Sequence, residues 1–461
     1  MSSEGAGQGE GSARWADAGE QRPLKSVSTR QRHIADMAKK YAGSPLTTLS
    51  HHLDLLWLWE AYGEIRRDSA PGVDGQTVAV YGENLEANLR SLLERAKSGS
   101  YQAPLVKRVH IPKSDTETRP IGMPTVEDKV LQRAVKMLLD AIYEQDFLDC
   151  SYGFRPGRST HQALQALRET VMAMDGGWVL DVDVRKFFDT IPRQKLREVL
   201  SRRIGDGVIT KLIHKWLKAG VWEAGEVTYP EAGTPQGGII SPLLSNVFLH
   251  EVLDGWFEFE IKPKLRGKAV LIRYADDFVV VCERRDDADA LLEQVKVRFE
   301  SYGLAIHPEK TRIVDFRHPW KSGHKPQTFD FLGFTHYWEK TRRGGYAVTR
   351  KTRAKKFSAA LQRIEGWCKK HRHKTLPEQH EELSAQVSGH YAYYGLRGNY
   401  RALANFCDRV KRKWHYWLNR RSRERSDGER LWELLDTYFV LPAPRIVHVA
   451  PVPQLTWSFP S

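Results

Sequence analysis

The chain has 461 residues, a net charge of +14 at pH 7 and 41% hydrophobic residues. That length predicts about two to four folding units with real cores. No window approaches the ~18–20 uninterrupted apolar residues of a membrane span. The four cysteines are widely spaced without a C-x-x-C pair, which argues against a disulfide framework and a structural zinc site. Because the N-terminus lacks the apolar core of a signal peptide, we expect a cytoplasmic protein.

In chain order, the N-terminal 45 residues are predicted to be a weakly ordered tail. A helix is expected from Leu46 to Tyr62, a turn over 71–75 and an amphipathic helix over 83–97, ended by Ser98-Gly99-Ser100. Residues 106–112 alternate like a strand, and residues 128–147 carry an apolar stripe typical of a core helix. Another helix is expected over 160–174, then one over 286–304, and residues 354–436 are predicted to be mostly helical.

The most informative segment is LIRYADDFVVVC, residues 271–282, in which two apolar runs flank Asp276 and Asp277. Short apolar runs on either side of a turn indicate a strand, a turn and a second strand. A solvated turn is the ordinary explanation, since Asp is common in turns. Two carboxylates between buried strands are expensive unless they are paired or hold a metal ion.

A second acidic segment, WVLDVDVRKFFDTI at 178–191, argues for the metal. Its period of two predicts a strand on which Asp181 and Asp183 share one face. A strand carrying an Asp, together with a hairpin carrying Asp-Asp, is what two-metal nucleotidyl transfer requires. Mg²⁺ prefers such oxygen ligands. Asp181 is expected to tune the site rather than bind metal, and Asp189 to start a helix as an N-cap or to form a turn.

Several blocks in order resemble the reverse transcriptases encoded by group II introns, which also serve as splicing maturases. These blocks are PGVDGQT (71–77), RPIGMP (119–124), SYGFRPGRS (151–159), GTPQGGIISPLLSNVFL (233–249), YADD, FDFLGF (329–334) and HYAYYGLRGNYRAL (390–403). The resemblance implies an α/β right-hand polymerase, with an antiparallel catalytic sheet in fingers and palm followed by a helical thumb and maturase domain. The implied domains are a tail (1–45), an N-terminal extension (46–104), fingers and palm (105–340), thumb and maturase (341–448) and a C-terminal tail (449–461).

The resemblance also implies roles for individual residues. Asp183, Asp276 and Asp277 would be the catalytic carboxylates and would bind two Mg²⁺ ions. The nucleotide or template would contact Lys113, Arg119, Arg155, Phe188, Gln236 and Gly237, with Phe188 excluding a 2′-hydroxyl. Leu332 and Gly333 would form the primer grip. By pattern alone, the cations are ordinary surface charges, Phe188 is a core aromatic and GTPQGG is a helix start.

The positive charge is concentrated in residues 339–430, which hold 24 Lys and Arg against 9 Asp and Glu, whereas the rest of the chain has a balance of −1. Aromatic residues including Tyr391, Trp414 and Tyr416 are interleaved with these cations. A solvated face is the ordinary explanation, but phosphates and stacked bases fit this composition better. The predicted RNA contacts are Lys411, Arg412, Lys413, Arg420 and Arg421.

The preferred hypothesis is an RNA-directed DNA polymerase in a bacterial cytoplasm that binds its intron RNA, assists splicing and copies the intron during retrohoming. Its partners would be structured intron RNA, RNA template, DNA primer and dNTPs, with no membrane. Two alternatives stay open: a domesticated reverse transcriptase in phage defence or repair, and a non-catalytic RNA chaperone. Because no cysteine pair of the longer relatives' endonuclease region follows the maturase block, we expect no DNA endonuclease activity. The sequence does not predict an oligomeric state.

Overall fold

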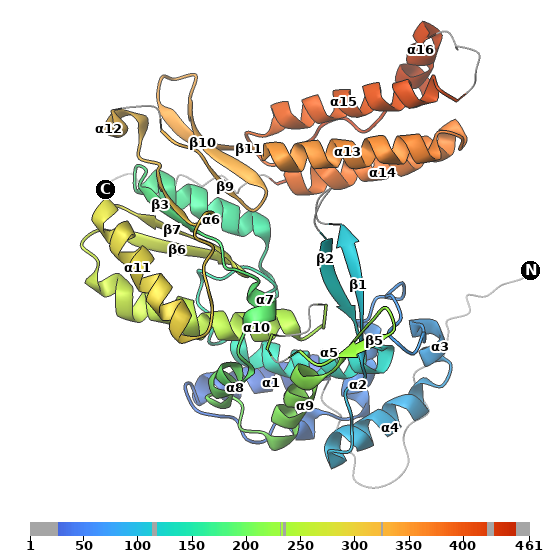
Figure 1. Ribbon diagram of the computed structural model, residues 1–461, viewed down its shortest axis with the longest axis vertical. Helices are drawn as coiled ribbons and strands as arrows, with labels where there is room; N and C mark the ends of the chain where they lie inside the picture. The colour runs from blue at the N-terminus through green and yellow to red at the C-terminus, as the bar shows by residue number, and fades with distance from the viewer. Residues whose placement is uncertain are drawn as a thin grey trace, which may run out of the picture.

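The computed structural model describes residues 26–112, 118–230, 232–233, 237–323, 326–421 and 428–448. Three sheets organise these residues (Figure 1), and their strand orders are β2-β1-β4-β5, β6-β7-β3-β8 and β11-β10-β9. We call them the N-terminal, central and C-terminal sheets. None of the described helices is both long and apolar enough to cross a membrane.

The first helix corrects the prediction of a weakly ordered tail over residues 1–45. Residues 1–25 lie outside the described ranges, but α1 (Val27–Lys40) is a regular helix whose Ile34 and Ala38 are buried in the main core. Its C-terminal end is fixed by the Arg203 guanidinium, which donates to the Ala38 carbonyl oxygen at 3.0 Å and to Asp146. Sequence reasoning missed this helix because it is strongly polar outside those few positions.

The next helices cover residues 46–104. The helix expected from Leu46 begins only at Leu55, because the Asp54 carboxylate caps it by accepting from the Trp57 amide at 2.9 Å. The helix expected over 83–97 forms, and it ends where Gly99 adopts φ 81°. The helices here are η1 (Ser50–His52), α2 (Leu55–Gly63), α3 (Val78–Gly82) and α4 (Leu85–Ser98).

The N-terminal sheet and its helices follow. The strands are β1 (Val106–Pro112), β2 (Thr118–Met123), β4 (Val221–Glu223) and β5 (Glu226–Thr228), with β1 antiparallel to β2 and parallel to β4. Helix α5 (Val126–Tyr143) buries the whole predicted apolar stripe, so its assignment to the core is confirmed. Helices α8 (Arg193–Ser201) and α9 (Gly207–Lys218) precede β4 in the chain.

The central sheet is antiparallel throughout, as predicted for the catalytic sheet. One face packs on α6, β9, β10 and β11, and the other on α10, η2 and α11. Its strands and covering helices are α6 (Thr160–Ala173), β3 (Trp178–Val182), α7 (Phe187–Thr190), α10 (Ser241–Leu249), the π-helical η2 (His250–Ile261), η3 (Lys262–Lys264), β6 (Ala269–Tyr274), β7 (Asp277–Cys282), α11 (Arg285–Ser301) and β8 (Arg312–Asp315).

The C-terminal part has a core of its own. In Figure 1 the long helices α13 to α15 lie together at the top of the view, and their apolar faces form a separate cluster. The hairpin of β10 and β11 spans the predicted boundary at 340, so the helical region starts only at Ala354. The elements are α12 (Pro319–Ser322), β9 (Phe329–Phe331), β10 (Phe334–Lys340), β11 (Tyr346–Thr352), α13 (Ala354–His371), α14 (Leu376–Tyr394), α15 (Tyr400–Leu418) and α16 (Gly428–Tyr438).

Candidate active site

The acidic hairpin has the form that the sequence predicts. Strands β6 and β7 pair up to Tyr274 opposite Asp277, so Ala275 and Asp276 make the turn. The pairing of β3 with β7 ends at Val182 opposite Phe278. Asp183 and Asp277 are the next residues on these neighbouring strands, which lie about 4.8 Å apart in a sheet. The fold therefore brings Asp183 to the hairpin that carries Asp276 and Asp277.

The carboxylates share one electrostatic environment. Loss of hydration, together with the negative charges of Asp276, Asp183 and Asp181, raises the pKa of Asp277 to about 7. Burial and the charge of Asp183 also raise the pKa of Asp276, while Arg119 opposes this increase. Burial raises the pKa of Asp181 to about 6 against the effect of Arg312. Negative charge is therefore destabilising at this strand end, and a cation would relieve it.

The carboxylate oxygens do not form a ready-made metal cluster. Asp183 Oδ2 lies 3.8 Å from the Lys310 ammonium, and Asp181 Oδ2 lies 3.4 Å from Arg312 Nε. Within the described ranges, no three His, Cys, Asp or Glu side chains are grouped so that they could hold a metal ion. The assignment of Asp183, Asp276 and Asp277 as metal ligands therefore stays a prediction.

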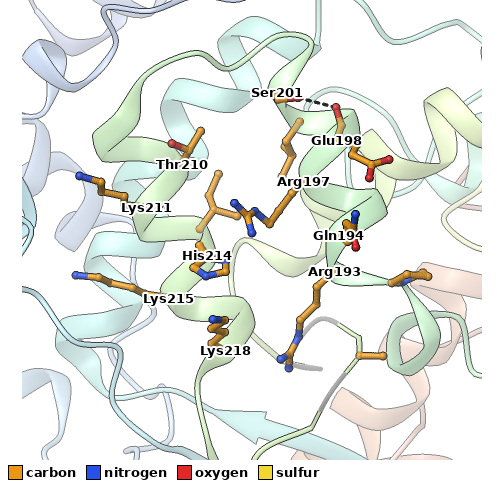
Figure 2. Close-up of a pocket in the computed structure, with 14 residues that line it drawn as sticks. Arg193, Gln194, Arg197, Glu198, Ser201, Thr210, Lys211, His214, Lys215 and Lys218 are labelled. Atoms are coloured by element: carbon orange, nitrogen blue, oxygen red, sulfur yellow. Dashed lines mark hydrogen bonds between the residues drawn. The ribbon is translucent and has the colours of Figure 1, made fainter.

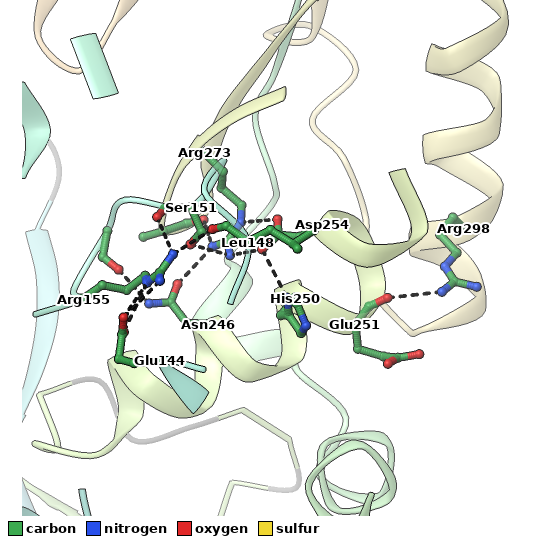
Figure 3. Close-up of polar contacts among 12 residues, drawn as sticks. Glu144, Leu148, Ser151, Arg155, Asn246, His250, Glu251, Asp254, Arg273 and Arg298 are labelled. Carbon is green, nitrogen blue, oxygen red and sulfur yellow. Dashed lines mark hydrogen bonds and ion pairs between the residues drawn. The ribbon is translucent and has the colours of Figure 1, made fainter. Parts of the chain in front are cut away.

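A fully buried arginine supports the hairpin turn (Figure 3). The Arg273 guanidinium makes two hydrogen bonds to Asp254, at 2.7 and 2.5 Å, and donates to Ser151 Oγ at 2.8 Å. It also donates at 2.9 Å to Asn246 Oδ1 and to the carbonyl oxygen of Ala275, the residue before Asp276. Sequence reasoning missed this network, although an arginine inside an apolar strand must be paired.

Arg155 does not have the predicted role at the nucleotide or template. Its side chain is buried and makes a bidentate ion pair with Glu144, with a closest separation of 3.0 Å (Figure 3). It also donates to the carbonyl oxygens of Leu148 and Ser151 at 2.7 and 2.9 Å. Its donors are occupied in shaping the loop before α6, so the prediction is corrected to a structural role.

Two other predicted nucleotide contacts, Arg119 and Gly237, lie on described residues in or against β2. The charge of Arg119, an exposed residue on β2, lowers the pKa of Asp276, which places this cation within electrostatic reach of the acids. Gly237 adopts φ 101° and packs so closely on β2 that a Cβ atom would lie 2.1 Å from the Gly122 carbonyl oxygen. Lys113 and Gln236 fall outside the described residues.

Phe188 lies in α7, five residues after Asp183, and is half-buried with its ring centroid 5.5 Å from that of Phe187. Its proposed contact with the sugar stays a prediction. Asp189 is not an N-cap, because Lys186 precedes α7 in that position; Asp189 lies within the single turn of this short helix.

The predicted primer-grip residues form a hairpin turn. Leu332 and Gly333 both have positive φ, 48° and 81°, and join β9 to β10. The Tyr393 hydroxyl donates to the Leu332 carbonyl oxygen at 2.9 Å. Burial, with a smaller contribution from the charge of Asp277, raises the pKa of Tyr393 to about 12. The turn, helix α14 and the acidic hairpin are therefore neighbours, as a primer grip would require.

The predicted RNA contacts on and after α15 fall into two groups: cations that are already held by other parts of the protein, and cations that are more exposed. Lys411 pairs with Asp436 at 2.8 Å, Lys413 pairs with Glu365, and Arg421 donates to the Lys374 carbonyl oxygen at 2.9 Å. Arg412 pairs with the exposed Asp408 one turn earlier at 3.1 Å, and Arg420 lies 4.3 Å from the Tyr416 ring centroid.

Not all the interleaved aromatic residues are available for stacking on bases. Tyr391 and Trp414 are buried in the core of the helical region, so the expectation that they stack on bases is wrong. Tyr400 and Tyr416 remain exposed.

Comparison with known proteins decides the family. Residues 111–336 match the family described as reverse transcriptase (RNA-dependent DNA polymerase). The protein YkfC of Escherichia coli is 32% identical over 376 residues, which cover 73% of this chain and 95% of YkfC. The group II intron-encoded protein LtrA of Lactococcus lactis is 32% identical over 309 residues, 54% of this chain and 49% of LtrA.

The chain belongs to the group II intron-encoded reverse transcriptases. Nuclear intron maturase 4 of Arabidopsis thaliana is a more distant relative, 24% identical over 51% of this chain. The family is one of RNA-directed DNA polymerases with a right-hand fold, and it uses divalent metal ions. The α/β region around the antiparallel central sheet and the helical C-terminal region agree with that architecture. The chain spans about half the length of LtrA.

Proposed function

We propose that this protein copies RNA into DNA at the end of strands β3 and β7, with Asp183, Asp276 and Asp277 holding two Mg²⁺ ions. The observation that carries the proposal is the register that sets Asp183 beside the acidic hairpin. The donor chemistry fits, since Mg²⁺ prefers carboxylate oxygens. When bound, such ions lower the pKa of the primer 3′-hydroxyl and stabilise charge on the leaving pyrophosphate.

The chain's own residues would supply the rest of the chemistry. The charge of Arg119 acts on Asp276. Its planar guanidinium is suited to bind the triphosphate of the incoming nucleotide through two parallel hydrogen bonds. The Leu332–Gly333 turn would position the primer, and Phe188 would exclude a ribose 2′-hydroxyl. The Lys310 ammonium, 3.8 Å from Asp183 Oδ2, adds positive charge beside this carboxylate.

Primer extension tests this assignment. A purified protein should extend a DNA primer on an RNA template with dNTPs and Mg²⁺, and Asp276→Ala with Asp277→Ala should reduce synthesis to background while RNA binding remains. The matched control is Asp286→Ala with Asp289→Ala, which removes two exposed acids from α11. Normal synthesis by the first double variant would refute the site.

We further propose that the RNA partner is a structured group II intron, that the protein assists its splicing, and that it copies this RNA during retrohoming. The kinship with LtrA and the basic C-terminal helical region support this proposal. Sequencing of RNA that co-purifies with the protein should recover an intron that flanks its own gene. Recovery of unrelated RNA, with no intron around the gene, would favour the role in defence or repair.

A further inference from the structure

Helices α8 and α9 enclose a groove of about 1160 Å³ that none of the predicted site residues line (Figure 2). We call it the α8–α9 groove. Its fourteen lining residues include five Lys or Arg and a single acid, Glu198. Outside residues 339–430 the chain carries a balance of −1, so this groove is a local concentration of positive charge.

The cations gather there because each helix is amphipathic. Leu196 and Leu200 of α8, and Ile213 and Trp216 of α9, are buried in the main core. Polar faces of this kind are ordinarily just solvated. Here the two polar faces turn toward each other instead, and Figure 2 shows Arg193, Arg197, His214 and Lys218 in the space between the helices.

The positive charge of the groove is not neutralised by the protein. Across the described ranges, no ion pair joins Arg193, Arg197, Lys211 or Lys218 to an acid, and the buried Arg193 Nε has no hydrogen-bond partner. Partial burial lowers the pKa of His214, and the charges of Arg197, Lys218 and Arg193 lower it further. Like charges held together in this way favour binding of an anion.

We propose that the α8–α9 groove binds the phosphodiester backbone of an RNA strand. A polyanion fits better than a small phosphate compound, because the groove exceeds the ~300–1,000 Å³ of ordinary ligand pockets. Lys211 and Lys218 are seven residues apart on α9, about 10 Å along the axis. Two cations at that separation can contact different phosphates of one strand, which a single small phosphate group cannot do.

The groove adjoins the segment that follows Asp183. It is bordered by Pro192 and Ala232, and the neighbouring Gly233 amide donates to the Ile191 carbonyl oxygen at 2.9 Å. A strand leaving the active site could therefore continue into the groove. The inference rests on the proposed RNA-directed function, and the RNA could be either the unpaired template ahead of the primer or a folded intron.

The test uses two double variants. The groove variant carries both Arg197→Glu and Lys218→Glu, and a control variant of equal charge change carries both Lys264→Glu and Lys268→Glu. All four side chains are exposed, so the folds should survive. The two probes are a thirty-nucleotide single-stranded RNA and a stable RNA hairpin, each titrated at several salt concentrations. For at least one probe, the groove variant should bind about tenfold more weakly than the control variant. The slope of log Kd against log salt concentration should be smaller by about 1.4–1.8, the value for two lost phosphate contacts.

The outcomes separate the two RNA sources and the two proposals. Loss of extension only on templates with long overhangs supports the template, and loss of hairpin binding supports a folded RNA. Binding of both probes equal to that of the control variant would overturn the groove proposal. Extension of a primer with a two-nucleotide overhang should be unchanged in the groove variant, whereas its absence in the wild type would instead refute the proposed function.

Discussion

At the scale of single residues, Asp277 shows how the clustered acids affect the fold. Its pKa is raised to about 7, against about 3.9 for an ordinary Asp. A carboxyl group with a raised folded-state pKa stabilises the protein fully only below pH ~4, and this stability is lost as pH rises through about 7. At neutral pH and above, the ionised side chain therefore destabilises the metal-free protein.

We expect Asp277→Asn to abolish synthesis yet raise the melting temperature in EDTA. Because part of the Asp277 side chain is still exposed to solvent, which screens these charges, the gain at pH 8 should be about 1 kcal/mol, or about 2–4 °C. It should be smaller at pH 5, where the folded wild type is protonated. Mg²⁺ should stabilise the wild type more than the variant. Thermal denaturation at both pH values measures this, with Asp286→Asn as control, and a variant less stable than wild type at pH 8 contradicts the prediction.

At the scale of elements, the acidic turn depends on the loop that precedes α6. The Tyr152 amide donates to the Arg273 carbonyl oxygen at 2.9 Å, and the Arg273 amide donates to the Cys150 carbonyl oxygen at 2.8 Å. Gly153 packs directly on the turn, so that a Cβ atom there would lie 2.3 Å from the Ala275 amide nitrogen. The loop and the turn therefore form one rigid unit.

Gly153→Ala should displace this turn, because Cβ and backbone atoms do not approach so closely. A shift of about 1 Å at the carboxylates should lower the rate of primer extension about 100-fold, with a stability loss of about 1–3 kcal/mol. Single-turnover extension rates measure the first effect and denaturant unfolding the second. Gly366→Ala is the control, since no atom lies within 4 Å of its added Cβ. A Gly153→Ala rate within twofold of wild type would contradict the argument.

The same elements show what the sequence could and could not predict. The strands around Asp181 and Asp276 and the stripe of α5 follow from periods of two and 3.6, which need only local residues. The Arg155–Glu144 and Arg273–Asp254 pairs join elements far apart in the chain, so no local pattern contains them. The paired charged faces of α8 and α9 were missed for the same reason, although the i, i+4 spacing of Arg193 and Arg197 was a usable signal.

At the scale of the whole molecule, the C-terminal region differs from the rest of the chain in its charge and in having a separate core. The C-terminal helical region, α13–α16, has its own core, and residues 339–430, which include most of it and the β10–β11 hairpin before it, carry nearly the whole charge excess. The start of this region lies within electrostatic reach of the active site, because the charge of Lys356 on α13 lowers the pKa of Asp277. RNA bound near the start of α13 would therefore lie close to the carboxylates, which agrees with one protein binding and copying the same strand.

Arg412 and Tyr416 on α15, and Arg420 two residues beyond its end, are exposed at intervals of four residues. Arg412→Gln with Arg420→Gln should reduce the salt dependence of log Kd for intron RNA by about 1.4–1.8, the value for two phosphate contacts. Lys411→Gln with Lys413→Gln is the matched control, because these ammonium groups are already held by Asp436 and Glu365. The control should change the salt dependence much less and should instead lower thermal stability. Equal salt dependence for the two double variants would contradict this prediction. It would show that cations paired with acids contact RNA as much as the exposed Arg412 and Arg420 do.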